Sequence, residues 1–212
     1  MKKVRVVGLG PGNLDYLLPI AKRVIEESEI LIGGSRHLEA LSINNKEKIL
    51  LDGNYKKVME FLEYNYSKYD IAVVVSGDTG FYSLSSMVKK YVPIDNLEFI
   101  PGISSLQYMF SKLCLTWDKA LMKSVHGRKF DYIDCIDKYS YIGLLTDKVS
   151  TPVSIAEELI KYGYSDDIIF HVGERLSYED ELITSCSPLQ ASKGDFDPLS
   201  VVIIENKGYK GE

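Results

Sequence analysis

The sequence predicts an α/β fold in two domains, with a mostly parallel sheet in the first domain and a mixed sheet in the second. Short apolar runs alternate with helix-like segments along the chain, which is the pattern of βαβ units. Many of these runs are bounded by glycine or proline, as is typical of buried parallel strands. The 212 residues, 45% of them hydrophobic, can bury the core of one large domain or of two small ones.

The first domain is expected to span residues 1–112. Each apolar run in it is followed by a turn and then by a segment with helical periodicity, so successive strands are joined by right-handed crossovers. The expected strands are 4–7, 30–32, 71–75 and 99–100, and the expected helices are 14–27, one around 58–62, 81–91 and 104–113.

The second domain is expected to span residues 113–212 and to begin with a linker-like stretch at 113–118. Thr151 and Pro152 open a helix, because threonine caps a helix and proline fits its first turn. The segment 176–187 can form an antiparallel hairpin, which would make the second sheet mixed. The expected strands are 119–125, 141–145, 168–172 and 199–205, and the expected helix is 151–162.

Three glycine-containing turns follow three of the apolar runs of the first domain. They read Gly8-Leu-Gly-Pro-Gly12, Ser76-Gly-Asp-Thr-Gly80 and Pro101-Gly-Ile-Ser-Ser105. Ligands of open α/β sheets bind beyond the carboxyl ends of the strands, and glycine there lets bare backbone approach a ligand closely. The turns therefore predict a small-molecule site built mostly from main chain.

Each turn also has a purely structural interpretation. The first departs from the G-x-G-x-x-G dinucleotide fingerprint, and its proline removes a backbone donor; it can equally be a ligand-free strand-to-helix turn. Asp78 can accept hydrogen bonds from an amine or ribose hydroxyls, or cap a helix near Gly80, and the two roles can coexist. Ser104 and Ser105 offer hydroxyls and helix-terminal amides to a ligand, or act as an ordinary N-cap.

The histidines do not assemble a nucleophilic triad. His171 lies within an apolar run and is expected to be a core histidine. His37 follows Arg36, and His126 precedes Arg128; such pairs suit anion binding, although both can also be solvated loops. No histidine or cysteine spacing predicts a metal site.

Charge and cysteine content narrow the function classes. The net charge of −5 provides no global basic field for nucleic acid or an anionic membrane surface. The three cysteines are far apart and form no CxxC pair, so reduced thiols in the cytoplasm are expected. The apolar run after Met1 is too short for a signal peptide or a membrane span.

The order and spacing of the three turns, with Phe81-Tyr82 after the second, resemble the tetrapyrrole methylases, which are two-domain enzymes that use S-adenosylmethionine. The resemblance covers essentially the whole chain. Three stretches further resemble the branch that methylates C-5 of precorrin or cobalt-precorrin (precorrin-6B or cobalt-precorrin-7 type) in cobalamin biosynthesis: 31–38, 104–110 and 124–128. The chain resembles the stand-alone form rather than the form fused to a C-15 methyltransferase/decarboxylase. It departs from the family at Thr79, where proline is usual, and at Leu17-Leu18, where the first motif usually continues Leu-Thr.

The resemblance implies that S-adenosylmethionine binds in a cleft between the two domains and leaves as S-adenosylhomocysteine. It places the cofactor contacts at Pro11, Gly77, Asp78, Phe81, Ser104 and Ser105 in the first domain and, more loosely, at Leu145, Gly173, Glu174, Pro198 and Leu199 in the second. A basic rim of Arg36, His37, His126 and Arg128 would meet the carboxylates of the corrinoid substrate. His126 is a candidate general base, although water can take the proton instead.

The same resemblance implies a homodimer and an association with a separate C-15 methyltransferase/decarboxylase. Several alternatives remain open at this point: methylation of a different corrin carbon, action on ribosomal RNA or on translation-factor diphthamide, and a non-catalytic module that binds a tetrapyrrole or a nucleotide. The negative charge and the absence of Lys/Arg clusters count against RNA.

Overall fold

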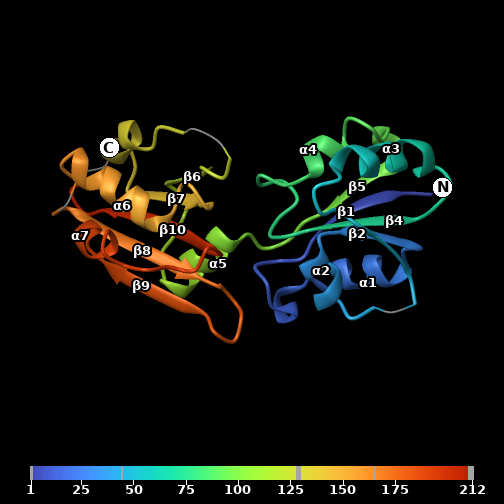
Figure 1. Ribbon diagram of the computed structural model, residues 1–212, viewed down its shortest axis with the longest axis horizontal. Helices are drawn as coiled ribbons and strands as arrows, with labels where there is room; N and C mark the ends of the chain where they lie inside the picture. Colours follow the sequence, from blue (N-terminus) through green and yellow to red (C-terminus); the bar gives the residue numbers. More distant parts are fainter. Residues whose placement is uncertain (1, 44, 128–129, 165, 210–212) are drawn as a thin grey trace. The chain divides into compact units, whose positions relative to one another are not determined.

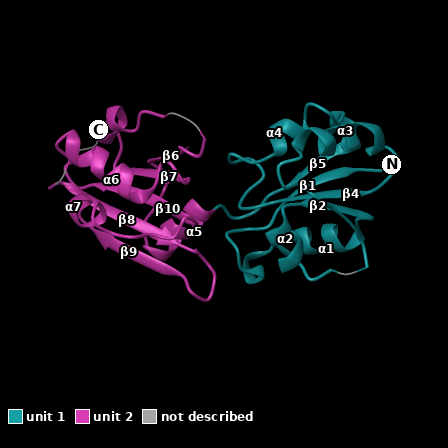
Figure 2. Ribbon diagram, in the orientation of Figure 1, with its two compact units in different colours: residues 1–104 teal, residues 105–212 magenta. Residues whose placement is uncertain are grey.

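Two compact units, Met1–Ser104 and Ser105–Glu212, make up the chain (Figure 2). The computed structural model describes residues 2–43, 45–127, 130–164 and 166–209. Within these residues each unit contains one five-stranded sheet, parallel in the first unit and mixed in the second. The predicted α/β class and the contrast between the two sheets are confirmed.

The first sheet is entirely parallel and carries helices on both faces (Figure 1). Two inner strands, Ile30–Gly33 and Ile71–Val75, are continuous buried apolar runs, because both faces of the sheet are covered there. The strand order is β3 (Glu47–Leu50), β2 (Ile30–Gly33), β4 (Ile71–Val75), β1 (Val4–Gly8) and β5 (Leu97–Ile100). One face is covered by α1 (Pro19–Glu27) and α2 (Ser35–Ala40), the other by α3 (Tyr55–Asn65) and α4 (Ser85–Val88). A short 3₁₀ turn, η2 (Ile94–Asn96), precedes β5.

Two predicted helices of the first unit are wrong in extent. The segment 14–27 is split into a 3₁₀ turn, η1 (Leu14–Tyr16), and α1, because Pro19 forces Leu18 into an extended conformation (ψ 141°). The segment 81–91 contains only the short helix α4. Tyr82 has a left-handed backbone (φ 50°), which no α-helix accommodates, and the chain bends until Ser85. Helix α2 and strand β3 were not predicted.

The second sheet pairs one parallel ladder with three antiparallel ladders. Its order is β6 (Ala120–Ser124), β7 (Tyr141–Leu145), β10 (Ser200–Asn206), β8 (Ile168–Glu174) and β9 (Leu182–Cys186). An antiparallel hairpin is present as predicted, but it pairs β9 with β8, and only β9 lies within the predicted segment 176–187. One face packs on α6 (Pro152–Lys161), α7 (Pro188–Ala191) and the 3₁₀ segment η3 (Ile133–Lys138). As predicted, Thr151 caps α6 by accepting a hydrogen bond from the Ser154 amide.

Helix α5 (Ser105–Lys112) covers the other face of the second sheet and packs on β7 and β10. It can approach closely because two sheet residues are glycines: an added Cβ would lie 3.2 Å from the Leu106 side chain at Gly143 and 3.0 Å from the Met109 sulfur at Gly173. The division between the units therefore falls at 104/105, earlier than the 112/113 boundary expected from the sequence. Among the described residues, no helix combines the length and apolar character needed to cross a membrane.

Candidate active site

The three glycine turns leave three neighbouring strands of the first sheet. The first turn follows β1, the second follows β4, the third follows β5, and β1 lies between the other two. Because all three strands are parallel, their carboxyl ends meet at one edge, where ligands of open α/β sheets bind. The segments that the sequence singled out are thus brought together by the fold.

The turns pack backbone against backbone at glycines. A Cβ atom on Gly8 would lie 2.6 Å from the Gly77 carbonyl oxygen and 2.8 Å from the Gly102 nitrogen. Gly10 and Gly77 form an antiparallel bridge with backbone hydrogen bonds of 3.2 and 2.8 Å, and both have positive φ (86° and 64°). Glycine is therefore needed for space at Gly8 and Gly102 and for conformation at Gly10 and Gly77.

We expect Gly102→Ala to lower the free energy of unfolding by about 1–3 kcal/mol or more, as overpacked sites do. The added carbon would lie 2.2 Å from the Gly77 oxygen, which is backbone and has little freedom to move. Gly34→Ala is the matched control in the turn after β2, because its nearest neighbours would lie 3.7 Å away. Denaturant unfolding of both variants tests the expectation, and equal effects would contradict it.

Asp78 lies between the second and third turns and uses both carboxylate oxygens. Oδ1 accepts a hydrogen bond from the Gly80 amide at 2.7 Å, and Oδ2 accepts one from the Gly102 amide at 3.0 Å. The bond to Gly80 shapes an Asx-type turn rather than capping a helix, since α4 begins only at Ser85. The carboxylate thus joins two of the three turns.

The other predicted first-unit contacts lie on the same three turns. Pro11 is partly exposed in the first turn, and Phe81, after the second, stacks edge-to-face on Tyr82 with ring centroids 4.8 Å apart. Ser104 is buried in the third turn, and Ser105 begins α5. Gly77, Asp78 and these residues are therefore gathered at one edge of the first sheet.

Arg36 and His37 lie in α2, directly after the carboxyl end of β2, at the same edge of the sheet. Burial and the neighbouring Arg36 charge lower the pKa of His37, so its ring is neutral at neutral pH. Its Nε2 atom is buried without a hydrogen-bond partner among the described residues. Arg36, which is exposed, is therefore the positively charged member of this pair.

In the second unit, the predicted cofactor residues meet at one end of β7, β10 and β8. Val201 of β10 is paired with both Leu145 of β7 and Gly173 of β8. Pro198 and Leu199 precede β10, and the Leu199 carbonyl accepts a hydrogen bond from the Arg175 amide at 2.9 Å. Residues far apart in the sequence are thereby aligned in one row.

Glu174, the last residue of β8, is a buried carboxylate that has no cation beside it in the described part of the chain. It is 8% exposed, and its Oε1 accepts a hydrogen bond from the Asp197 amide at 2.7 Å. Its Oε2 has no hydrogen bond or ion pair within the described residues, because Arg175 pairs with Asp180 (2.5 Å) and Asp197 (3.9 Å) instead. A buried carboxylate with an open oxygen is suited to a cationic ligand group.

The sequence interpretation missed two buried hydroxyls at this end of the second sheet. Thr146 follows β7 and Ser200 begins β10, and each is 7% exposed. The Thr146 hydroxyl donates to the Ser200 carbonyl at 2.6 Å. Polar residues at the ends of two apolar runs were the available signal, but only the antiparallel register of β7 and β10 brings them together.

His126 follows β6 and is held by the loop after β7. Its Nδ1 lies 3.1 Å from the Thr146 carbonyl oxygen, and since a carbonyl only accepts, Nδ1 carries the proton of this bond. In the neutral ring Nε2 is then an acceptor, as a general base requires. The Gly127 amide donates to Asp147 Oδ2 at 2.6 Å. Arg128, the fourth expected residue of the basic rim, lies outside the described residues.

The tether between Asp147 and the His126 loop should persist well into acidic solution. Hydrogen bonds from the Gly127, Ser150 and Val149 amides lower the pKa of Asp147. Because the pKa of Asp147 is lowered in the folded protein, its carboxylate stays ionised and keeps the hydrogen bond from the Gly127 amide at every pH above the usual pKa of an aspartate. The bond is lost only as the pH falls below about 4 and the carboxylate is protonated. An NMR pH titration of the Gly127 amide tests this; a midpoint above pH 5 would contradict it.

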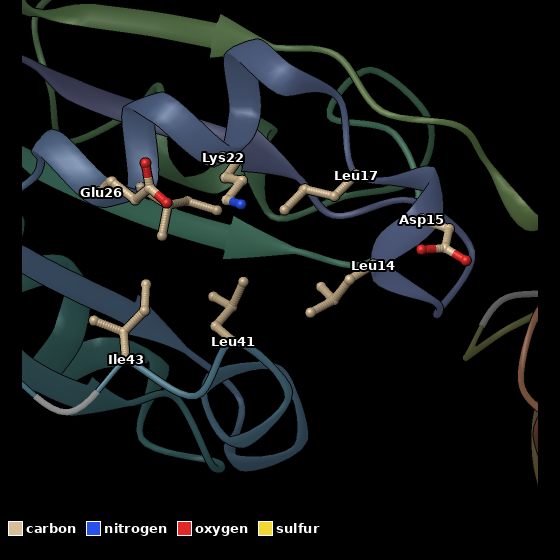
Figure 3. Close-up of a pocket in the computed structure, with 8 residues that line it drawn as sticks. Leu14, Asp15, Leu17, Lys22, Glu26, Leu41 and Ile43 are labelled. Atoms are coloured by element: carbon tan, nitrogen blue, oxygen red, sulfur yellow. The ribbon is translucent and has the colours of Figure 1, made fainter.

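Two cavities lie apart from these residues, one in each unit. The first, of about 300 Å³, is lined by aliphatic side chains of η1, α1 and the segment after α2, with Lys22 and Glu26 at its edge (Figure 3). The second, of about 390 Å³, lies between the segment after β6 and α6, where the Tyr132 hydroxyl donates to Glu158. Neither cavity is lined by a predicted cofactor residue.

The fold is that of an α/β protein in which three glycine turns meet at one edge of a parallel sheet. The sequence profile of the Tetrapyrrole (Corrin/Porphyrin) Methylases matches residues 3–189, and the chain belongs to this family. The resemblance inferred from the glycine turns is confirmed.

Several relatives with named reactions are similar to this chain over nearly its whole length. The cobalt-precorrin-7 C(5)-methyltransferase of Salmonella typhimurium is 28% identical over 202 residues, covering 95% of this chain and 98% of that protein. The probable cobalt-precorrin-7 C(5)-methyltransferase of Methanocaldococcus jannaschii is 29% identical over 208 residues, covering 95% and 97%. The uroporphyrin-III C-methyltransferase of Thermus thermophilus, crystallised with S-adenosylhomocysteine, shares the fold with a TM-score of 0.76 at 18% identity, covering 96% of this chain and 97% of that one.

Proposed function

We propose that this protein is an S-adenosylmethionine-dependent methyltransferase that methylates C-5 of a precorrin or cobalt-precorrin in cobalamin biosynthesis. The observation that carries the proposal is the junction of three glycine turns at the ends of β4, β1 and β5. Relatives that match the chain over nearly its whole length and bear the name of this reaction support the choice of substrate.

The residues present fit such a cofactor. The three glycine turns meet at the sheet edge where ligands of open α/β sheets bind, and Glu174 offers an open carboxylate oxygen to a molecule that carries an ammonium and a sulfonium group. We infer that the first-unit set around Asp78 and Ser104 and the second-unit set around Leu145, Gly173, Glu174 and Leu199 both contribute to its binding.

Methyl transfer from S-adenosylmethionine requires little acid–base or nucleophilic chemistry from the protein's side chains. When bound, S-adenosylmethionine supplies a methyl group on a positively charged sulfur, which is a strong electrophile. The turns orient and shield the reactants from water, and such alignment can contribute about 7–11 kcal/mol to lowering a barrier. Arg36 meets substrate carboxylates, and His126 accepts the proton released by the substrate through Nε2. We further infer a cytoplasmic homodimer that passes its product to a separate C-15 methyltransferase/decarboxylase.

Methyl transfer to a defined corrinoid tests the proposal. The purified protein is incubated with cobalt-precorrin-7 and S-adenosylmethionine, and S-adenosylhomocysteine formation is followed together with the product's mass and carbon NMR spectrum. One added methyl group at C-5 is expected. Methylation at another carbon would overturn the substrate assignment, and cofactor binding without turnover on any corrinoid would favour a non-catalytic binding module.

A further inference from the structure

We propose that Tyr82 is a substrate-binding residue whose ring packs on the apolar, conjugated face of the corrinoid. This inference rests on the proposed function, in which Arg36 meets the carboxylates of the substrate, and it adds a partner for the apolar part of the same molecule. It follows from the backbone conformation of Tyr82, from the exposure of its side chain and from its place after β4.

The backbone of Tyr82 is held in a left-handed conformation that costs a tyrosine stability. Its φ is 50°, and among the non-glycine residues with positive φ in the described part of the chain it is the only aromatic one. Ser42 and Cys114 adopt this conformation just after helices α2 and α5, where it is a usual way to end a helix. Tyr82 ends no helix, because it precedes α4, which begins at Ser85. Strained residues of this kind cluster at ligand-binding and catalytic sites.

The loop around Tyr82 is fixed by the contacts of its neighbours. The Ser83 hydroxyl donates a hydrogen bond to the Thr79 carbonyl and accepts one from the Ser85 amide at 3.2 Å. The Phe81 ring meets the Tyr82 ring edge-to-face, with 82° between the ring planes. Tyr82 is oriented by these neighbours and yet remains 39% exposed. A single exposed aromatic residue is ordinary, but one presented from a fixed and strained loop is suited to stack on a ligand.

Tyr82 lies beyond the carboxyl end of β4, at the edge of the first sheet that also carries Arg36. Strand β4 is paired in parallel with β2, and Arg36 follows the end of β2. A corrinoid has a conjugated, apolar face and a rim of carboxylates. An exposed aromatic ring and an exposed arginine, placed after two adjacent strands, are complementary to these two parts. Packing on the face of the macrocycle stabilises the bound substrate and the transition state alike, so it affects KM rather than kcat.

Three substitutions of Tyr82 separate contact with the substrate from backbone strain. Tyr82→Ala and Tyr82→Gly both remove the ring, but only glycine adopts positive φ without cost. For both variants we expect the KM of cobalt-precorrin-7, and its Kd in an absorbance titration, to rise about tenfold. Tyr82→Phe keeps the ring and should stay within about twofold of the parent protein. The value of kcat and the Kd of S-adenosylhomocysteine should be unchanged in all three variants.

Two outcomes of these measurements would overturn the proposal. A normal KM in Tyr82→Gly would show that residue 82 only shapes the loop. A loss in Tyr82→Phe as large as that in Tyr82→Ala would show that the hydroxyl, and not the face of the ring, carries the effect. Denaturant unfolding checks the strain itself: the midpoint of Tyr82→Gly should lie above that of Tyr82→Ala, and equal midpoints would contradict the premise.

Cys114→Gly is the matched control for the relief of strain. Cys114 has a φ of 54° and is exposed, but it belongs to the second unit and to none of the glycine turns. This substitution should leave KM and both dissociation constants unchanged; a tenfold rise would make the effect general and contradict the proposal. If the parent protein binds no corrinoid, the proposed function itself fails. If the parent binds the corrinoid and Tyr82→Ala binds it equally well, only the role of Tyr82 fails.

Discussion

Substituting His126 by alanine is expected to lower kcat by about 10²–10⁴-fold while leaving the Kd of S-adenosylhomocysteine unchanged. The Nδ1 atom of His126 is held by the Thr146 carbonyl, which leaves Nε2 as the acceptor for a proton. Because His126 belongs to the loop after β6 and none of the cofactor turns, its loss should affect the chemical step and not cofactor binding.

His171→Gln is the matched control for His126. His171 is buried between Ser185 and Glu205, with Nδ1 and Nε2 hydrogen bonds of 2.7 and 2.9 Å, and should matter for stability without slowing the folded enzyme. Steady-state kinetics with the corrinoid, with calorimetry for the cofactor, separates the two residues. Near-normal turnover in His126→Ala would contradict the role of His126 as general base and would indicate that water accepts the proton.

Glu174→Gln is expected to weaken binding of both S-adenosylmethionine and S-adenosylhomocysteine by about 10–100-fold. The buried Glu174 carboxylate has one open oxygen, and hydrogen bonds to charged groups are worth about 1.5–3 kcal/mol. Both ligands carry an ammonium group, so both should respond. Gln retains the acceptor for the Asp197 amide, and the fold should survive.

Glu179→Gln, an exposed position in the β8–β9 connection, provides the control for loss of one negative charge. Calorimetric titration of the two variants gives the comparison. If the two substitutions change affinity equally, the effect is one of net charge, and Glu174 has no specific role at the site.

The parts of the fold that could be predicted are those fixed by local signals. The apolar runs of β1 and β4, with glycine turns after them, predict parallel strands, and the parallel arrangement alone brings the turns to one edge. The start of α6 was equally clear, because Thr151 and Pro152 are both local signals for a helix N-terminus.

Other features depend on contacts between segments distant in the sequence. The assignment of α5 to the second unit follows from its packing on Gly143 and Gly173, which nothing within 105–112 reveals. The late start of α4 within the predicted helix 81–91 depends on the positive φ of Tyr82, which a tyrosine does not signal. The division at Pro19, by contrast, was readable from the proline itself.

In the candidate site, too, individual residues could be predicted from local signals, whereas contacts between segments distant in the sequence could not. The sequence indicated that Asp78 could bind a ligand or cap a helix near Gly80, but the bond that spans to Gly102 depends on the strand order β4-β1-β5. Thr146 and Ser200 were missed because their contact exists only through the pairing of β7 with β10. The neutral state of His37 depends on its burial, which a sequence does not give.

The most direct test of the central claim is calorimetric titration of the purified protein with S-adenosylhomocysteine. The account predicts one molecule bound per chain with a micromolar Kd, and loss of this binding when Gly77 is replaced by a bulky residue, because Gly77 has positive φ and packs against Gly8 and Gly102. An absence of heat from a folded protein would contradict the claim that the three joined turns form a cofactor site.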